Sequence, residues 1–243
     1  MTIKTRAAVS GPLPETVWDS APPFSRPRPW TEPEYLALET NHLIEFSGGH
    51  LEVLRMPTRR HQQIVLCLYR LLFEFVTSRH LGTLLIAPFR VRLWPGKFRE
   101  PDLIFMAAAH RAREHNDYFE GADLVVEVGS GDAGDRERDL VTKRDEYARA
   151  RIPEYWLVDP QMETITVLTL TDAAYIPYGI FRRGETAHAQ LLTRFTVAVD
   201  VVLDAALAYA AWRAHREQRT NLAVCLRYFA PGVVYSCHHV PAD

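Results

Sequence analysis

The stretches FREPDLIFM (98–106), DLVVEV (123–128) and DLVTKRDEYARARIPEYWLVDP (139–160) decide the fold that this sequence predicts. The first two contain near-continuous apolar runs, which are typical of strands buried on both faces of a sheet. The third predicts a helix from about Asp135 to Ala150, followed by an apolar and aromatic strand over 155–158. A strand, a helix and a strand at this spacing form a βαβ unit with parallel strands, so we expect an α/β domain.

Weaker patterns on either side extend this core. A capping-box pattern at Thr31 and Glu34 predicts a short helix that ends at about Thr40. The clearest helix runs from Arg59 to about Arg79, because its apolar residues recur on one stripe. The other predicted elements are a hairpin over 43–54, strands over 82–88 and 89–94, a surface excursion over 107–122, peripheral antiparallel strands over 162–170 and 175–184, and a last helix over 201–218.

Length and composition indicate one globular domain with appendages. The chain has 243 residues, of which 47% are hydrophobic and 24% are charged, as in ordinary globular proteins. Residues 1–29 hold six prolines and little periodicity, so we expect a disordered proline-rich arm. The domain is then expected over residues 30–218. Residues 219–243 are weakly patterned and form a tail to which we assign no fold.

Targeting and charge patterns exclude several classes of protein. No apolar run approaches the roughly 18 to 20 residues of a membrane helix, and Lys4 and Arg6 are not followed by the apolar region of a secretory signal. Three scattered cysteines do not make a disulfide framework, so the cytoplasm is the expected location. The formal net charge of −2 gives no general attraction for nucleic acid, and any such binding requires a local basic patch.

Two acidic residues stand at the ends of the predicted central strands. Asp102 opens one strand and Glu127 lies near the end of the next. If these strands are antiparallel neighbours, both carboxylates reach the same rim of the sheet. Glu127 interrupts an apolar run, and a charge in a buried strand is costly unless it is paired or coordinates a cation. Two such acids suit Mg²⁺ or Mn²⁺, although Asp102 taken alone is more simply explained as a turn acid at the start of a strand.

Lys143 is expected to face the sheet rather than water. Leu140, Lys143 and Tyr147 share one face of the predicted helix, and that face is the apolar one. A cation beside two acids can orient an attacking water or stabilise the charge of a phosphodiester transition state. The alternatives are a helix pair with Asp139 and an edge lysine that extends its charge to solvent. Two acids and a lysine together indicate a metal-dependent phosphodiester-cleaving site.

The segments EPDLIF (100–105), GADLVVEVGS (121–130) and DLVTKRDEYARARIPEYWLVDP (139–160) follow one another in a characteristic order. Together they resemble the Uma family of restriction endonucleases, which belongs to the PD-(D/E)XK phosphodiesterase superfamily. LIEFSGGHLEVL (43–54), followed by a helix that opens with His61, fits the N-terminal part of that family. The resemblance covers about residues 30–205.

This resemblance implies a restriction-endonuclease-like α/β core, a mixed β-sheet flanked by helices, with Mg²⁺ at the acids. Asp102 matches the PD acid and Glu127 the (D/E) acid. The superfamily lysine lies two residues after that acid, where this chain has Gly129; the family resemblance places it at Lys143 instead. Glu45 and His61 match family positions near the site. Their alternatives are a solvent-facing hairpin acid and a surface histidine at the start of a helix.

Other patterns compete with this interpretation. GSGDAG (129–134) matches GxGxxG between a strand and a helix, but the acid spacing after it does not fit a dinucleotide fold. This loop also differs from the Ser-Pro-Ser-like run that the family has here: the chain has the serine, Ser130, but no proline after it. A zinc site at the C-terminal cysteines and histidines lacks paired C-x-x-C spacing. Two interpretations remain for a basic run before Asp102, a solvated strand face or phosphate contacts; its members are Arg90, Arg92, Lys97 and Arg99.

The sequence therefore predicts a Mg²⁺-dependent endonuclease that hydrolyses DNA phosphodiester bonds. In this prediction Asp102 and Glu127 bind the metal ion, and Lys143 assists the water or the transition state, with Glu45 and His61 near the site. The alternative is a nuclease-like fold without catalysis that binds nucleic acid or a protein partner. DNA is the expected partner, membrane association is not expected, and a homodimer is left open.

Overall fold

The computed structural model describes residues 28–40, 42–129 and 138–205, with only the backbone of residues 138–140. Several expectations fall outside these residues: almost all of the arm over 1–29, most of the GSGDAG loop, the continuation of the last helix to Gln218, and the tail over 219–243. No helix in the described ranges is long and apolar enough to cross a membrane.

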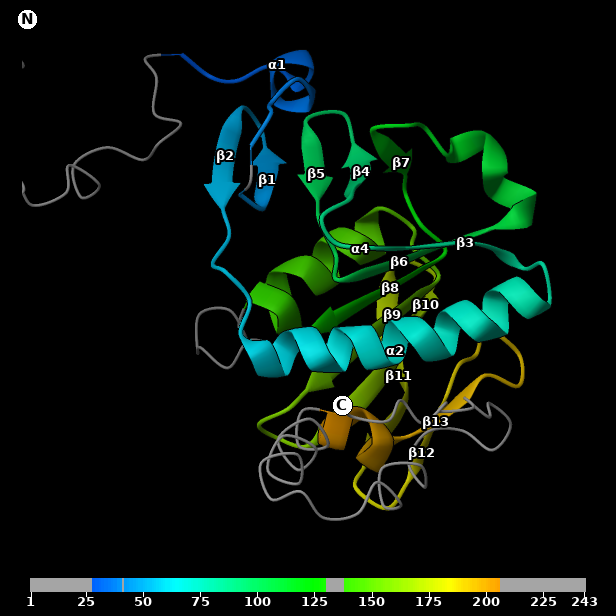
Figure 1. Cartoon of the computed structure of the whole chain (residues 1–243). Coiled ribbons are helices and arrows are strands. Elements are labelled where there is room, and N and C mark those ends of the chain that lie inside the picture. Colours follow the sequence, from blue (N-terminus) through cyan, green and yellow to red (C-terminus); the bar gives the residue numbers. More distant parts are fainter. Residues whose placement is uncertain (1–27, 41, 130–137, 206–243) are drawn as a thin grey trace, which may run out of the picture.

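A mixed six-stranded sheet forms the centre of the molecule (Figure 1). Its strand order is β11-β10-β9-β8-β6-β3, in which β8 and β9 are parallel and the other neighbours are antiparallel. This is the parallel pair predicted from the βαβ spacing. The strands are β3 (Gly82–Ile86), β6 (Leu103–Ala107), β8 (Leu124–Val128), β9 (Glu154–Asp159), β10 (Thr164–Thr171) and β11 (Ala174–Arg182).

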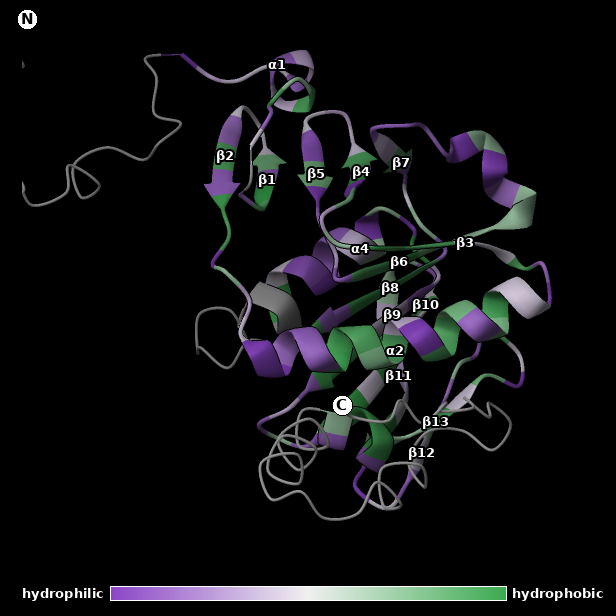
Figure 2. Cartoon of the chain, viewed as in Figure 1, coloured by the Kyte–Doolittle hydropathy of each residue, from purple (hydrophilic) through white to green (hydrophobic). Residues whose placement is uncertain are grey.

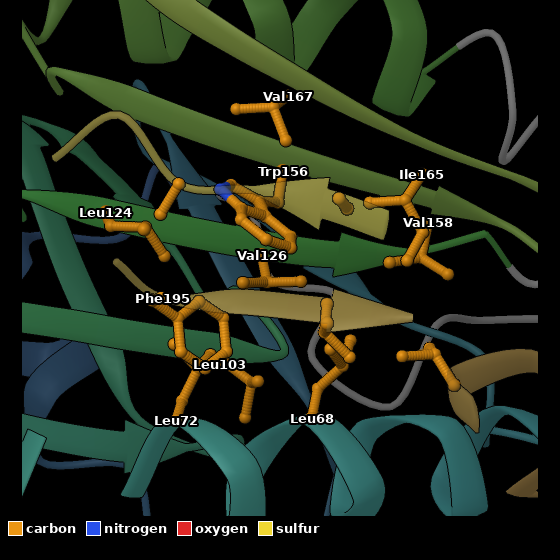
Figure 3. Close-up of a cluster of buried hydrophobic side chains, with 14 of the residues drawn as sticks. Leu68, Leu72, Leu103, Leu124, Val126, Trp156, Val158, Ile165, Val167 and Phe195 are labelled. Atoms are coloured by element: carbon orange, nitrogen blue, oxygen red, sulfur yellow. The ribbon is translucent and has the colours of Figure 1, made fainter. Parts of the chain in front are cut away.

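Helices cover both faces of this sheet. The helix α2 (Arg59–Ser78) packs on one face, and α4 (Arg144–Arg149) packs on the other. Because side chains alternate along a strand, Leu103 and Val126 point toward α2 while Ile104 and Val125 point toward α4. Figure 3 shows the α2 side, where Leu68 and Leu72 lie among residues such as Trp156, Val126 and Phe195. The same alternation directs Glu127 toward α4.

The helix α2 forms as its sequence predicts. Thr58 caps its first turn by accepting a hydrogen bond from the His61 N–H at 3.2 Å. Its buried stripe repeats every three or four residues and contains Ile64, Val65, Leu68, Leu72 and Val76. In Figure 2 the strands β6 and β8 are hydrophobic over most of their length, as expected of strands covered on both faces.

A second, five-stranded sheet lies beside the first, in the order β2-β1-β5-β4-β7. One of its faces packs on α1 (Glu32–Leu36) through Tyr35, Ile44, Phe46 and Phe98. The alternate residues of β1 and β5 point to the opposite face, and that face is charged. The strands are β1 (Ile44–Ser47), β2 (His50–Val53), β4 (Arg90–Trp94), β5 (Lys97–Arg99) and β7 (Tyr118–Glu120).

Several local predictions need correction. The first helix has the expected capping box but ends at Leu36, not at about Thr40. The predicted helix over 135–150 is a π-helical segment η3 (Arg138–Lys143) followed by the short α4. The last helix begins at residue 199, two residues early. Short strands were missed because three residues carry too little periodicity: β5, β7, β12 (Thr186–His188) and β13 (Thr196–Ala198). The excursion over 107–122 also holds the 3₁₀ segment η2 (Ala108–Arg113).

We expect Gly82→Ala to destabilise the protein far more than Gly48→Ala. A Cβ on Gly82 would lie 2.0 Å from the Met106 carbonyl oxygen, so the β3–β6 pair would have to separate. A Cβ on Gly48 meets no atom within 4 Å and carries only the cost of its φ of 56°, about 1 kcal/mol. Urea unfolding of both variants measures the difference. Equal losses would show that β3 and β6 tolerate the displacement.

Candidate active site

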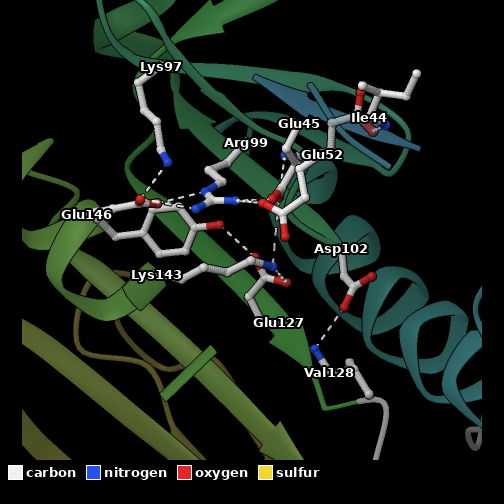
Figure 4. Close-up of polar contacts among 12 residues, drawn as sticks. Ile44, Glu45, Glu52, Lys97, Arg99, Asp102, Glu127, Val128, Lys143 and Glu146 are labelled. Atoms are coloured by element: carbon white, nitrogen blue, oxygen red, sulfur yellow. Dashed lines mark hydrogen bonds and ion pairs between the residues drawn. The ribbon is translucent and has the colours of Figure 1, made fainter. Parts of the chain in front are cut away.

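The two predicted metal ligands lie side by side at one end of the central sheet. Leu103 pairs with Val126 in the antiparallel β6–β8 ladder, which places Asp102 next to Glu127. The Asp102 Oδ2 accepts a hydrogen bond from the Val128 N–H at 2.8 Å (Figure 4). The same oxygen lies 3.1 Å from the Nε2 of His61. The antiparallel neighbours expected from the sequence are therefore confirmed.

Both oxygens of Glu127 contact the helix that follows its strand. The Lys143 Nζ lies 2.8 Å from Oε2, and the Tyr147 hydroxyl donates to Oε1 at 2.6 Å. The side chains of Glu127 and Lys143 are only 5% and 4% exposed, so Lys143 faces the sheet as predicted and does not extend to solvent. The side chain of Asp139 lies outside the described residues. A charged strand residue thus has a charged partner, as its burial requires.

Glu45 comes to the same place from the second sheet. It is 1% exposed, its Oε1 lies 4.0 Å from the Lys143 Nζ, and it accepts a hydrogen bond from the Glu100 N–H at 3.3 Å. Its Oε2 accepts from the Nη1 of Arg99. The solvent-facing alternative for Glu45 is therefore wrong, and so is the surface alternative for His61, which is buried against Asp102.

Sequence reasoning missed a second ion-paired group beside these residues. The Arg99 guanidinium makes a two-point contact with Glu146, from Nε to Oε2 at 2.6 Å and from Nη2 to Oε1 at 3.0 Å. The Lys97 Nζ lies 2.5 Å from Glu146 Oε1 and donates to the Ser47 hydroxyl at 3.2 Å. The signal that was available is the spacing of Lys143, Glu146 and Tyr147, which puts all three on one helix face.

The structure contradicts the solvated-face interpretation of the basic run at two of its four members. Lys97 and Arg99 are buried, so they are not a solvated face, and Glu146 and Glu45 already neutralise them. The other two arginines also contact carboxylates of this chain, Arg90 with Glu100 at 3.8 Å and Arg92 with Glu32 at 3.0 Å and Glu120 at 3.5 Å. Each of the four side chains thus has a carboxylate partner within this chain, and the phosphate-contact interpretation stays a prediction.

Burial and neighbouring charges shift the pKa values of groups around the site. Burial, followed by the charges of Glu127 and Glu45, raises the pKa of Tyr147 well above its usual value, so the hydroxyl stays a donor. Burial lowers the pKa of Arg99, but Glu45 and Glu146 more than offset this and the net shift is upward. Burial also raises the pKa of Glu100 to about 7, with Arg90 opposing and Glu45 reinforcing the shift.

The donor set at this rim fits a hard divalent cation. Asp102 uses Oδ2 for its contacts, and its Oδ1 takes no hydrogen bond from any described residue. Glu127 supplies a second carboxylate next to it, and Mg²⁺ is commonly held by one or two carboxylates completed by water and phosphate oxygens. No group of three or more His, Cys, Asp or Glu side chains in the described part of the chain is arranged to hold a metal ion. A metal here therefore depends on these two acids.

A mixed sheet flanked by helices, with two acids and a lysine at one rim, defines the class as a restriction-endonuclease-like nuclease fold. The solved structure entitled "Crystal structure of a putative nuclease belonging to DUF820 from Anabaena variabilis ATCC 29413" is similar to this chain at a TM-score of 0.59 and 18% sequence identity. The match covers 73% of this chain and 99% of that chain. At this identity the likeness shows the fold.

The chain belongs to the Uma2 family, described as "Putative restriction endonuclease", whose family model matches residues 32–201. The resemblance inferred from the sequence is thereby confirmed, together with the fold class. No curated protein matches the chain. The domain bounds at residues 30 and 218 stay a prediction.

We expect the stability of Glu100→Gln relative to the wild type to increase as the pH rises from acidic to alkaline. The pKa of Glu100 is raised from 4.5 to about 7 in the folded protein, so its protonated form contributes stability that is lost as pH rises through that range. Glutamine copies the protonated form, and the variant should gain roughly 3 kcal/mol on the wild type between about pH 4.5 and pH 8. Urea unfolding at both pH values measures this gain, with exposed Glu163→Gln as the control. A pH-independent difference would contradict the shift.

Proposed function

We propose that this protein is a metal-dependent endonuclease that hydrolyses DNA phosphodiester bonds. The observation that carries the proposal is the buried contact of Lys143 with Glu127, with Asp102 at the end of the neighbouring strand. A lysine and two carboxylates are the groups that such hydrolysis needs, because it requires a bound cation and a donor for the charge that develops on phosphorus oxygens. Membership of a family described as "Putative restriction endonuclease" supports the same reaction.

In this proposal Asp102 and Glu127 hold a Mg²⁺ or Mn²⁺ ion. When bound, the ion supplies Lewis-acid activation of water and neutralisation of phosphate charge. His61 and the Val128 N–H hold one oxygen of Asp102, which leaves the other for coordination. Tyr147 holds Oε1 of Glu127 in place.

Lys143 is the proposed donor to the reacting groups. Its ammonium has three N–H donors, and its 2.8 Å contact with the Glu127 Oε2 supports a role beside the acids. It orients the attacking water or stabilises the negative charge of the transition state. Glu45, whose Oε1 lies 4.0 Å from the Nζ, is a second anion that attracts the ammonium to this rim.

The second candidate function is a nuclease-like module that binds nucleic acid or a protein without catalysis. It is favoured by one observation: both oxygens of Glu127 are already engaged by Lys143 and Tyr147, so metal binding must compete with the lysine. The net charge of −2 and the neutralised basic run also offer little attraction for DNA. A cytoplasmic location, supported by the scattered cysteines, belongs to both proposals, and a homodimer stays a prediction.

We expect the purified protein to nick or linearise plasmid DNA when Mg²⁺ or Mn²⁺ is added, and EDTA to stop the reaction. Asp102→Ala, Glu127→Gln and Lys143→Ala should each lower the rate by at least about 100-fold, because each removes a ligand or a charge donor needed in the transition state. Gel electrophoresis of timed samples gives the rates.

Glu163→Gln is the matched control, since Glu163 is an exposed acid whose ion pair is with Arg183 and not with a residue of the site. It should cleave as the wild type does. Cleavage that survives all three site substitutions would rule out this assignment. Retained DNA binding with no cleavage by the wild type would favour the non-catalytic module.

A further inference from the structure

A closed ring of buried charges joins the second sheet to the helix that carries Lys143. We call it the charge ring and define it by Lys143, Glu45, Arg99 and Glu146 (Figure 4). Lys143 lies 4.0 Å from Glu45, Glu45 accepts from Arg99, and Arg99 binds both oxygens of Glu146. The ring is closed through the backbone, because Glu146 lies three positions after Lys143 in the continuous helical stretch formed by η3 and α4.

The ring is built by the alternation of two strands. Glu45 on β1 and Arg99 on β5 point away from the apolar face that holds Ile44, Phe46 and Phe98. The pairing of Phe46 with Phe98 places Glu45 beside Arg99. A charged face of the second sheet is thereby opposed to α4, and charged side chains from the helix complete it.

Such a ring is a poor way to gain stability. Desolvation of buried ion pairs offsets most of their attraction, and apolar residues of the same volume often stabilise a protein as well or better. What a buried, hydrogen-bonded ion pair does provide is a defined geometry, because each charge is strongly disfavoured in any unpaired position. The two-point contact of Arg99 with Glu146 is the most directional contact in the ring.

The helix that carries Lys143 needs such an anchor. Lys143 is the last residue of the π-helical segment η3, and the six-residue helix α4 follows it directly. Helical segments as short as these are held by tertiary contacts. Arg144 and Tyr147 attach it to the central sheet through Tyr175 and Glu127. Glu146 attaches it to the second sheet, on the side from which Glu45 approaches Lys143.

We propose that Glu146 is a positioning residue for Lys143. Its contact with Arg99 fixes the helix against β5 and leaves Glu45 shared between Arg99 and Lys143, so the ammonium stays on Glu127. Without the Glu146 charge, the Arg99 guanidinium turns toward Glu45 and Glu52, which it already contacts, and Lys143 loses its second anion. The catalytic consequence of this inference rests on the proposed nuclease function, whereas the placement of Lys143 does not.

The chain allows a direct test, because its lysines are only Lys4, Lys97 and Lys143. Pulsed acetylation followed by mass spectrometry of peptides gives the acetylation rate of Lys143 in the folded protein. The protection of Lys143 is the acetylation rate in urea-denatured protein divided by the rate in folded protein. We expect strong protection of Lys143 in the wild type and at least about a tenfold loss of that protection in Glu146→Gln. Glu163→Gln, which breaks an exposed ion pair, should leave the protection unchanged.

Arg99→Lys is the second variant, because lysine keeps the charge but cannot make the two-point contact. It should expose Lys143 as Glu146→Gln does, and the double variant should expose it less than the sum of the two, since both substitutions remove the Arg99–Glu146 contact. In the plasmid assay Glu146→Gln should lower the cleavage rate at saturating metal and leave the metal concentration for half-maximal rate unchanged. If Glu146→Gln does not fold, Arg99→Lys gives the same measurement.

Unchanged protection of Lys143 in a folded variant would overturn the proposal, whatever happens to cleavage. A loss of protection together with a lower cleavage rate supports it in full. A loss of protection in a protein whose wild type cleaves no DNA supports the positioning role and defeats the proposed nuclease function. The two failures are therefore distinguishable.

Discussion

The pairing of Glu127 with Lys143 is the interaction on which the rest of this structure depends. Glu127 lies in the central strand β8, where the residues around it are apolar and buried. A carboxylate there needs a cation and hydrogen-bond donors, and Lys143 and Tyr147 supply them from the next helix. The sheet and the helix cannot separate without exposing this pair, so the same contact that stabilises the βαβ unit also brings the site together.

The second sheet also contributes to this arrangement, because two of its charged side chains contact the helical segments that follow β8. Its apolar face packs on α1, and its charged face brings Glu45 and Arg99 to the helix. As a result, the environment of Lys143 is set by Arg99 and Glu45, which precede it by 44 and 98 positions along the chain. Asp102 stands apart from this group, with one oxygen held by His61 and Val128. The two acids therefore differ. Both oxygens of Glu127 are engaged, by Lys143 and Tyr147, whereas the Oδ1 of Asp102 accepts no hydrogen bond from a described residue.

Patterns of residues predicted the parts of the fold whose causes are local. Three patterns can each be recognised from neighbouring residues, and all were found in the structure: the capping box at Thr31, the apolar stripe of α2 and the continuous apolar runs of β6 and β8. The inward direction of Lys143 followed from helix geometry alone. The strand β5 was missed, because three residues give no usable period, and the burial of Lys97 and Arg99 on it was therefore not predicted.

The sequence by itself determined the α/β class and the inward lysine, since both follow from side-chain periodicity. It permitted the antiparallel pairing of the strands at Asp102 and Glu127, and the structure decided it. Only the tertiary structure decided what lies around them. The contacts of His61 with Asp102, of Arg99 with Glu146 and of Glu45 with Arg99 join residues 41 to 54 positions apart. A charge pattern in sequence does not reveal which opposite charge it meets, because that choice depends on how the two sheets pack.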